Sequence, residues 1–313
     1  MIWLTWRQHR RQALFTLAGL AVLAAFIVPT GLAMRHDYTR LGLAGCGSGG
    51  PGGACGPNMQ EFSSTYGSLV FVSVLMLVVP LLVGVFWGAP VIAREVEQGT
   101  HRMIWTQGIS RRRWALVKIG LLGGTVTVLA TLYGLGMAWW YVPLAHIDTR
   151  QNRFTEVFFD MQGVVPIGYT LLAVALGILI STMLPKALPA MAVTLAGFIA
   201  VRFTLAFFAR PRYMTPASAD YPVQGGSVGP AQGWVLSSSV HRADGTFVMS
   251  GAIKCPPNNA CAPELGLRPG AYNHQVFHPA DRFWAFQWIE TGICLALAAL
   301  LVWYAVHRIR RIG

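Results

Sequence analysis

Charged residues are scarce in this 313-residue chain, where they make up 12% of the sequence, against about 25% in an ordinary soluble domain. Acidic residues are the scarcer kind, with 12 Asp and Glu against 24 Lys and Arg, while 54% of all residues are hydrophobic. This shortage of charge excludes a water-soluble globule, and the high hydrophobic content excludes a disordered chain.

Long stretches of the sequence contain no charged residue at all. They cover residues 12–34, 62–93, 119–147 and 161–185. Each is longer than the roughly 20 apolar residues that carry a helix across a hydrocarbon core of about 30 Å. Two further stretches, 187–209 and 284–306, contain one charge each. Backbone groups inside lipid must bond to each other, which favours helices for runs of this kind.

We therefore predict an all-α polytopic membrane protein that forms a single domain over residues 1–313. The six predicted spans lie at about 12–34, 67–92, 114–140, 163–185, 187–209 and 284–306. Residues 1–11 are predicted to form an interfacial helix, with tryptophans toward lipid and arginines toward phosphate.

The basic residues predict the orientation of the chain. Six spans place both termini on one side, and that side takes most of the Lys and Arg residues but only two acids, Glu95 and Glu97. The loops of the other side carry nearly equal numbers of basic and acidic residues. The positive-inside rule therefore predicts cytoplasmic termini. The Lys and Arg residues beside the spans then face anionic lipid, so nucleic acid is not an expected partner.

Four of the five cysteines fall in the two outer loops. Cys46 and Cys55 lie in a glycine-rich stretch, and Cys255 and Cys261 lie in the long loop at 210–283 before the last span. Pairs confined to the oxidising side predict two short-range disulfides, Cys46–Cys55 and Cys255–Cys261. A metal site is the alternative, although Cys-x5-Cys is not a usual zinc spacing.

The long loop at 210–283 is too long for a plain connection, and we expect it to have structure of its own. Near its end, His274, His278 and Asp281 follow a His-x3-His-x2-Asp pattern that could place metal ligands on one face of a helix. Pro279 argues against a helix through this segment, and satisfied surface histidines are the simpler interpretation. No metal site is predicted.

Two charges lie inside the predicted spans. Counted along their helices, Arg202 and Glu290 reach nearly the same depth in the membrane. An unpaired charge there would cost at least a few kcal/mol. We therefore predict an Arg202–Glu290 ion pair or a shared polar network. The alternatives are that one of them lines a substrate path, or that the charged side chains simply snorkel toward the membrane surface.

The most informative segment follows the second span. Gly99 is expected to end the helix, Thr100 to cap a short helix over residues 101–107, and Ser110 to cap the third span. The result is a short amphipathic helix across the cytoplasmic face, between two rigid spans. A solvated helix end, stabilised by ion pairs, is the alternative interpretation of its charges.

This segment resembles the first cytoplasmic loop of ABC-2 type transporter permeases. The resemblance rests on Arg94-Glu95-x-Glu97-x-Gly99-Thr100, the short helix, and Ser110 with three arginines before the next span. The six spans, the interfacial helix, the long loop before the last span and the basic tail are similar to that family too. The motif itself covers only about residues 88–118.

The resemblance implies that the loop at 93–113 holds a coupling helix that docks on an ATPase subunit. The implied contact residues are Arg94, Glu95, Glu97, Gly99, Thr100, His101, Arg102 and Trp105. The family also implies a permease homodimer with two ATPase chains, and helices two and five facing the dimer axis. On that basis an apolar export path would be lined by Met76, Phe86, Trp87, Phe203 and Phe207.

The chain lacks the phosphate-binding loop that a nucleotide hydrolase needs. No Gly-x4-Gly-Lys-[Ser/Thr] pattern occurs, and Lys118, Lys186 and Lys254, the only lysines, lack that context. We expect no cofactor in this chain, with ATP and Mg²⁺ held by the separate ATPase subunit.

The expected function is that of the permease subunit of an ATP-driven exporter in a bacterial plasma membrane. Its cargo would be a hydrophobic or amphiphilic small molecule, such as a drug, an antibiotic or a lipid-like compound. One alternative is a structural or sensory membrane subunit that moves no substrate. A second is an outer-face enzyme that uses His274, His278 and Asp281.

Overall fold

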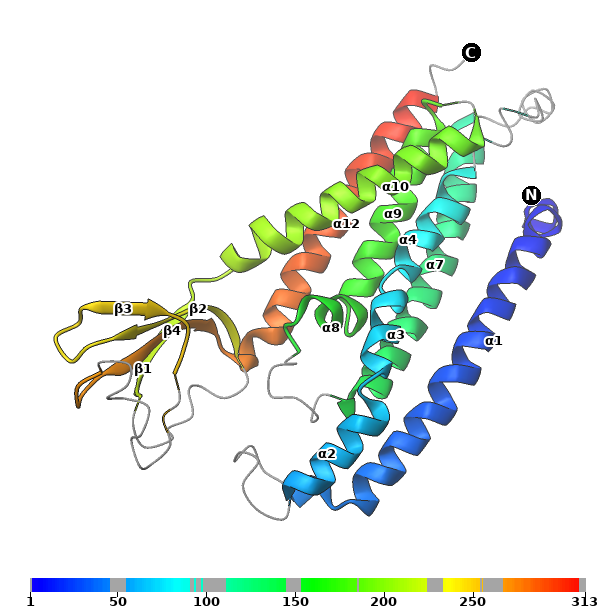
Figure 1. Cartoon of the computed structure of the whole chain (residues 1–313). Coiled ribbons are helices and arrows are strands. Elements are labelled where there is room, and N and C mark those ends of the chain that lie inside the picture. The colour runs from blue at the N-terminus through cyan, green and yellow to red at the C-terminus, as the bar shows by residue number, and fades with distance from the viewer. Residues whose placement is uncertain are drawn as a thin grey trace.

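The computed structural model shows a bundle of long helices with a small antiparallel sheet at one end (Figure 1). Both chain termini lie toward the opposite end, so the two ends are called the sheet end and the terminal end. The structure describes residues 2–45, 55–90, 93, 97, 111–144, 153–184, 186–223, 233–253, 255 and 267–309.

The α-helices make up most of the described chain. They are α1 (Ile2–Arg40), α2 (Cys55–Tyr66), α3 (Leu69–Met76), α4 (Val79–Val83), α7 (Arg111–Tyr141), α8 (Glu156–Met161), α9 (Val165–Ser181), α10 (Ala187–Phe203) and α12 (Phe283–Ile309). Two π-helical segments, η2 (Gly84–Gly88) and η4 (Thr204–Ala209), extend α4 and α10. The described residues also include three 3-10 turns: η1 (Leu43–Gly45), η5 (Arg210–Arg212) and η6 (Ala280–Arg282).

Among the described residues, five helical stretches are long and apolar enough to cross a membrane, so the chain is a multi-pass membrane protein. They are Ala18–Arg40, Leu69–Gly88, Leu116–Tyr141, Ala187–Arg212 and Ala280–Ile309. The remaining predicted span, the fourth at 163–185, corresponds to α9, which has only 17 residues and a length of about 26 Å. The six-span topology therefore stays a prediction.

The first span lies further along the chain than predicted. The charge-free run ends before Arg35, yet α1 continues to Arg40 without a break and includes the predicted interfacial helix at 1–11. Its last turns carry charges because each finds a partner: Tyr66 donates to Asp37 at 2.7 Å, and Arg40 lies 3.3 Å from Glu61. Pairing with α2 thus extends a helix that a charge count ends early.

The segment at 210–283 corrects the all-α prediction. It contains four antiparallel strands, β1 (Ala217–Pro222), β2 (Trp234–His241), β3 (Phe247–Ser250) and β4 (Tyr272–His278), in the order β1-β4-β2-β3. One face buries a small apolar cluster that includes Val223, Val240 and Leu267. The central strand β4 runs directly into α12 through η6, which fixes the sheet to the bundle (Figure 1).

Helix α9 is the centre of the bundle. Most of its side chains are buried, and it packs against α4, η2, α7, α10 and α12. Glycines allow the closest approach: Gly84 and Gly88 of η2 lie on Ala173 and Val174, and Gly177 lies on the backbone of η2. Pro80, in the first turn of α4, and the π-helical segment η2 interrupt the regular α-helix of the second span, whereas Pro166 stands in the first turn of α9 and does not interrupt that helix.

We predict that Gly177→Ala destabilises the protein by about 1–3 kcal/mol. The added Cβ would lie 2.6 Å from the backbone nitrogen of Ala89, so one helix must shift. Gly123→Ala in α7 is the matched control, because nothing lies within 4 Å of its Cβ position. That substitution should raise stability by up to about 1 kcal/mol. Thermal unfolding in detergent compares the two, and equal effects would contradict the packing described.

Candidate functional site

Five polar side chains from five segments form one buried cluster near the sheet end. Arg210 of η5 is its centre: its Nε donates to Glu290 Oε2 at 2.8 Å, and its Nη2 lies 2.5 Å from both Glu290 Oε1 and Asp160 Oδ1. Asp160 Oδ2 also accepts from Arg202, at 3.0 Å from Nε and 2.5 Å from Nη2. The Tyr169 hydroxyl donates to Glu290. The cluster thus connects α8, α9, α10, η5 and α12.

The charges of this cluster balance within a dry interior. Asp160, Arg210 and Glu290 have no exposed side-chain surface, while Arg202 is 23% exposed. Two guanidinium groups face two carboxylates, so the set is neutral as a whole. Burying four charges costs desolvation energy, and removing one partner leaves an uncompensated charge. The cluster is therefore stable only when complete.

Of the two predicted arrangements for Arg202 and Glu290, the structure shows the shared polar network and not the direct ion pair. Arg202 binds Asp160, and Glu290 binds Arg210, so the two residues are joined only through those partners. Counting residues along a helix gives the depth of a residue in the membrane but not the direction in which its side chain points. The predicted span bounds also leave Asp160 and Arg210 outside the membrane. Their positions directly beside the apolar runs at 161–185 and 187–209 are the sequence signal that could have found them.

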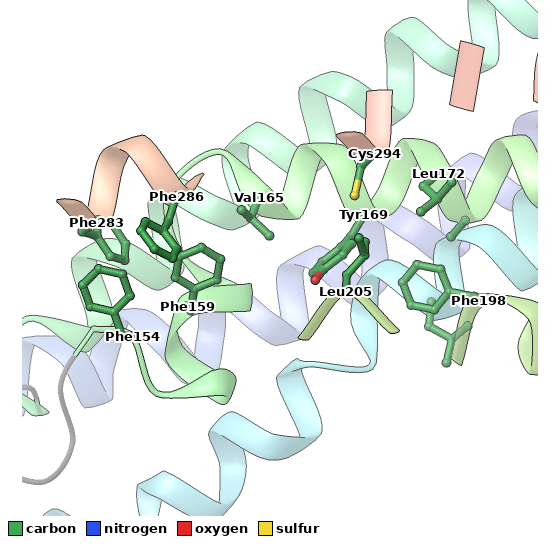
Figure 2. Packing of buried hydrophobic residues seen from close by; sticks show 12 residues of the cluster. Phe154, Phe159, Val165, Tyr169, Leu172, Phe198, Leu205, Phe283, Phe286 and Cys294 are labelled. Atoms are coloured by element: carbon green, nitrogen blue, oxygen red, sulfur yellow. The ribbon is translucent and has the colours of Figure 1, made fainter. Parts of the chain in front are cut away.

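Aromatic side chains enclose the cluster on the side of the sheet. The ring of Phe159 lies under the Arg210 guanidinium, whose Cζ is 4.2 Å from the centroid of that ring. The rings of Phe154, Phe159, Phe283 and Phe286 gather in one group that joins α8 to the start of α12 (Figure 2). Trp234 of β2 stacks on Phe154 at 6.1 Å. The sheet is therefore packed directly against the segment that carries the charges.

Gln287 of α12 fixes the start of α9. Its Oε1 accepts hydrogen bonds from the backbone nitrogens of Val164 at 3.0 Å and Val165 at 3.1 Å, and its Nε2 donates to the Phe159 carbonyl at 2.8 Å. One side chain thus satisfies two otherwise unpaired donors at a helix start and holds the end of α8.

The histidines of strand β4 do not form a metal site with each other. His274 and His278 lie on strand β4, where four residues span about 13 Å, too far for ligands of one ion. His274 pairs with Asp220 at 2.6 Å. His278 is buried, which lowers its pKa, and its Nε2 donates to the Pro211 carbonyl at 3.2 Å. Within the described ranges, no group of three or more His, Cys, Asp or Glu residues is placed to hold a metal.

Comparison with known proteins identifies the family. The family model described as "ABC-2 membrane transporter related" matches residues 17–210, which is more than half of the chain. The match includes the segment at 88–118 and every cluster residue except Glu290. No curated protein and no solved structure matches the chain.

The chain belongs to the ABC-2 membrane transporter related family.

Most of the coupling residues expected from this family lie outside the described residues. They are Arg94, Glu95, Gly99, Thr100, His101, Arg102 and Trp105. Glu97 is described: it is exposed, and its Oε2 accepts a hydrogen bond from the backbone nitrogen of Ala187 at 3.3 Å. This bond joins the segment after helix two to the first residue of α10. The docking role of these residues stays a prediction.

The path residues expected from the ABC-2 resemblance lie on helices two and five, which carry both π-helical segments. Phe86 of η2 is 56% exposed, and Phe203 and Phe207, which stack at 5.5 Å, are 54% and 51% exposed. Met76 and Trp87 are instead partly buried against neighbouring helices. Since α10 packs against η2, the π segments belong to two helices in contact. Such segments are frequent at functional sites.

The disulfide pairs of this ABC-2 family member stay predictions, because Cys46 and Cys261 lie outside the described residues. Cys255 is buried in the apolar cluster of the sheet. Cys294, in α12, is a free and buried thiol and packs against Gly168 of α9.

We predict that Glu290→Gln destabilises the protein by about 3–5 kcal/mol, because it leaves Arg210 buried with one charged partner fewer. Glu61→Gln is the matched control, since the Arg40–Glu61 pair is 57% exposed on both sides. That change should cost less than about 1 kcal/mol. Unfolding of the two purified variants in the same detergent measures the difference. Equal losses would show that the buried cluster contributes nothing specific.

Proposed function

We propose that the chain is the permease subunit of an ATP-driven exporter, moved by a separate ATPase subunit. The family match over residues 17–210 is the observation that carries this proposal, because such members are typically membrane subunits without catalytic activity of their own. The Arg94–Thr100 motif supports it. In this proposal two copies of the permease assemble with two ATPase chains in a bacterial plasma membrane, with cytoplasmic termini.

The exposed aromatic surface of helices two and five supports an apolar cargo. Phe86, Phe203 and Phe207 present rings rather than charges, as a hydrophobic or amphiphilic small molecule would require. In the assembled dimer these surfaces would face each other across the path. Outward transport is the direction expected for a permease of this kind.

The Glu97–Ala187 bond offers a route by which motion of the partner reaches the sheet end. An ATPase that pushes the loop at 93–113 would also push the start of α10, since Glu97 is bonded there. Helix α10 carries Arg202 near its C-terminal end, and Arg210 follows in η5. The ATPase would thus shift the bundle between two states that it contacts differently.

A structural or sensory subunit is the second candidate, and the same family match is compatible with it. An enzyme on the side of the sheet is not favoured, because His274 and His278 are each engaged elsewhere and lie far apart on β4.

We predict that the chain co-purifies with an ATPase and that Glu97→Ala lowers the ATPase activity of the complex at least about fivefold. Removing the carboxylate breaks its bond to α10 and uncouples the loop from that helix. Glu61→Ala, an exposed acid on α2, is the control and should leave activity unchanged. Capture of no nucleotide-binding chain would favour the structural subunit, and transport without nucleotide would refute the proposal.

A further inference from the structure

Helix α8 is a short, buried segment between the third and fourth spans. Phe158, Phe159, Asp160 and Met161 are all at most 2% exposed. Phe158 and Met161 pack into the cluster around Tyr141, while Phe159 packs into the cluster of α9 and α12. One helical turn therefore joins two apolar cores near the sheet end, across the bundle (Figure 1).

Non-helical residues flank α8 on both sides. Thr155 before it is extended, with ψ of 133°, and Gln162 after it is extended, with φ of −116° and ψ of 164°. Gly163 then takes a left-handed φ of 73°, which favours glycine. The segment can therefore turn about its ends without breaking a long helix, since a few such residues can act as a hinge.

Asp160 is the charged group that holds α8 in place. It is fully buried, and its two oxygens accept from two different arginines, Oδ1 from Arg210 and Oδ2 from Arg202. Neither arginine belongs to α8. Arg210 is fully buried and has a second carboxylate partner in Glu290. Arg202 bonds to Asp160, and its side chain is partly exposed. The Arg202–Asp160 contact is thus the one that can be released with the smaller loss.

The π-helical segment η4 lies between the two arginines and affects whether both can reach Asp160. Eight residues along a regular α-helix would leave Arg202 and Arg210 about 80° apart around the axis. The wider turn of Thr204–Ala209 reduces this angle and brings both guanidinium groups to one side. Conversion of η4 to a regular α-helix would turn one arginine away from Asp160.

We propose that α8 is a gate across the sheet end of the bundle and that the contact of Asp160 with the two arginines is its latch. The gate is closed in the structure. Movement of α10 and η5 that releases Arg202 first and then Arg210 opens it, by turning α8 about Gly163 and Thr155, and this turn also breaks the hydrogen bond from Gln287 to the Phe159 carbonyl. The inference rests on the proposed function, since a gate controls a path.

Hydrogen–deuterium exchange on the full-length chain in lipid nanodiscs tests the latch without any ATPase. Arg202→Gln and Asp160→Asn should each speed exchange of the α8 amides at least about tenfold. Exchange in α9 and in the sheet should rise much less than exchange in α8, since the loss of one buried charge also lowers the stability of the whole cluster. Glu61→Gln, which removes an exposed ion pair on α2, is the control and should alter nothing in α8.

Two results would overturn the gate. The first is unchanged exchange of α8 in both variants, which would show that the arginines do not hold it. The second is a rise of equal size in α8, α9 and α12, which would show that the cluster merely stabilises the whole bundle. A rise much larger in α8 than in α9 and the sheet supports the latch whether or not an ATPase partner exists.

A tether tests the link to transport. Phe159→Cys and Phe283→Cys, whose wild-type rings lie 5.7 Å apart, can be bridged by a short thiol cross-linker in a Cys294→Ser background. The bridged protein should still bind its ATPase but lose transport, and cleaving the bridge should restore it. Undiminished transport through the bridged protein would exclude α8 as the gate. If the wild-type chain binds no ATPase, the proposed function is refuted instead.

Discussion

The arrangement of the sheet end depends on one buried guanidinium group. Arg210 has no exposed side-chain surface, so its charge must be matched by neighbours rather than by water. Glu290 and Asp160 meet that demand, and in doing so they bring α12 and α8 against the end of α10. The aromatic rings of Phe154, Phe159, Phe283 and Phe286 lie together (Figure 2), and the Phe159 ring lies under the Arg210 guanidinium group. The position of the sheet follows, because β1 begins just after Arg210 and β4 ends just before α12.

Five of the six predicted spans overlap helical stretches that are long and apolar enough to cross a membrane, because the cost of burying charge in lipid acts on each stretch of chain by itself. The absence of charge does not mark the end of a helix whose charged residues have partners. Helix α1 continues to Arg40, where Asp37 and Arg40 bond to residues of α2. The sheet at 217–278 escapes prediction for another reason. Its strands are short and half-exposed, and their pairing joins residues far apart in the chain, such as Asp220 with His274.

The polar cluster shows the same limit at the level of single residues. Depth along a helix follows from counting residues, and it correctly marks Arg202 and Glu290 as charges that need partners. The direction of each side chain depends on helix rotation, on η4, and on the return of α8 into the bundle, none of which leaves a periodic signal. The family resemblance identifies the loop at 93–113, and the match over residues 17–210 confirms the family. What the structure adds is a physical connection from Glu97 through α10 to Asp160.

The central claim is that a motor at the terminal end acts on α8 at the sheet end. Labelling of an introduced cysteine by a membrane-impermeant thiol reagent tests it most directly. Met161 of α8 is 2% exposed and gives the reporter, as Met161→Cys in a Cys294→Ser background, and the Cys294→Ser parent gives the background labelling of the other four cysteines, which is subtracted. In proteoliposomes that contain the chain and its ATPase, the account predicts fast labelling only when ATP is supplied. Equal labelling with and without ATP would contradict it.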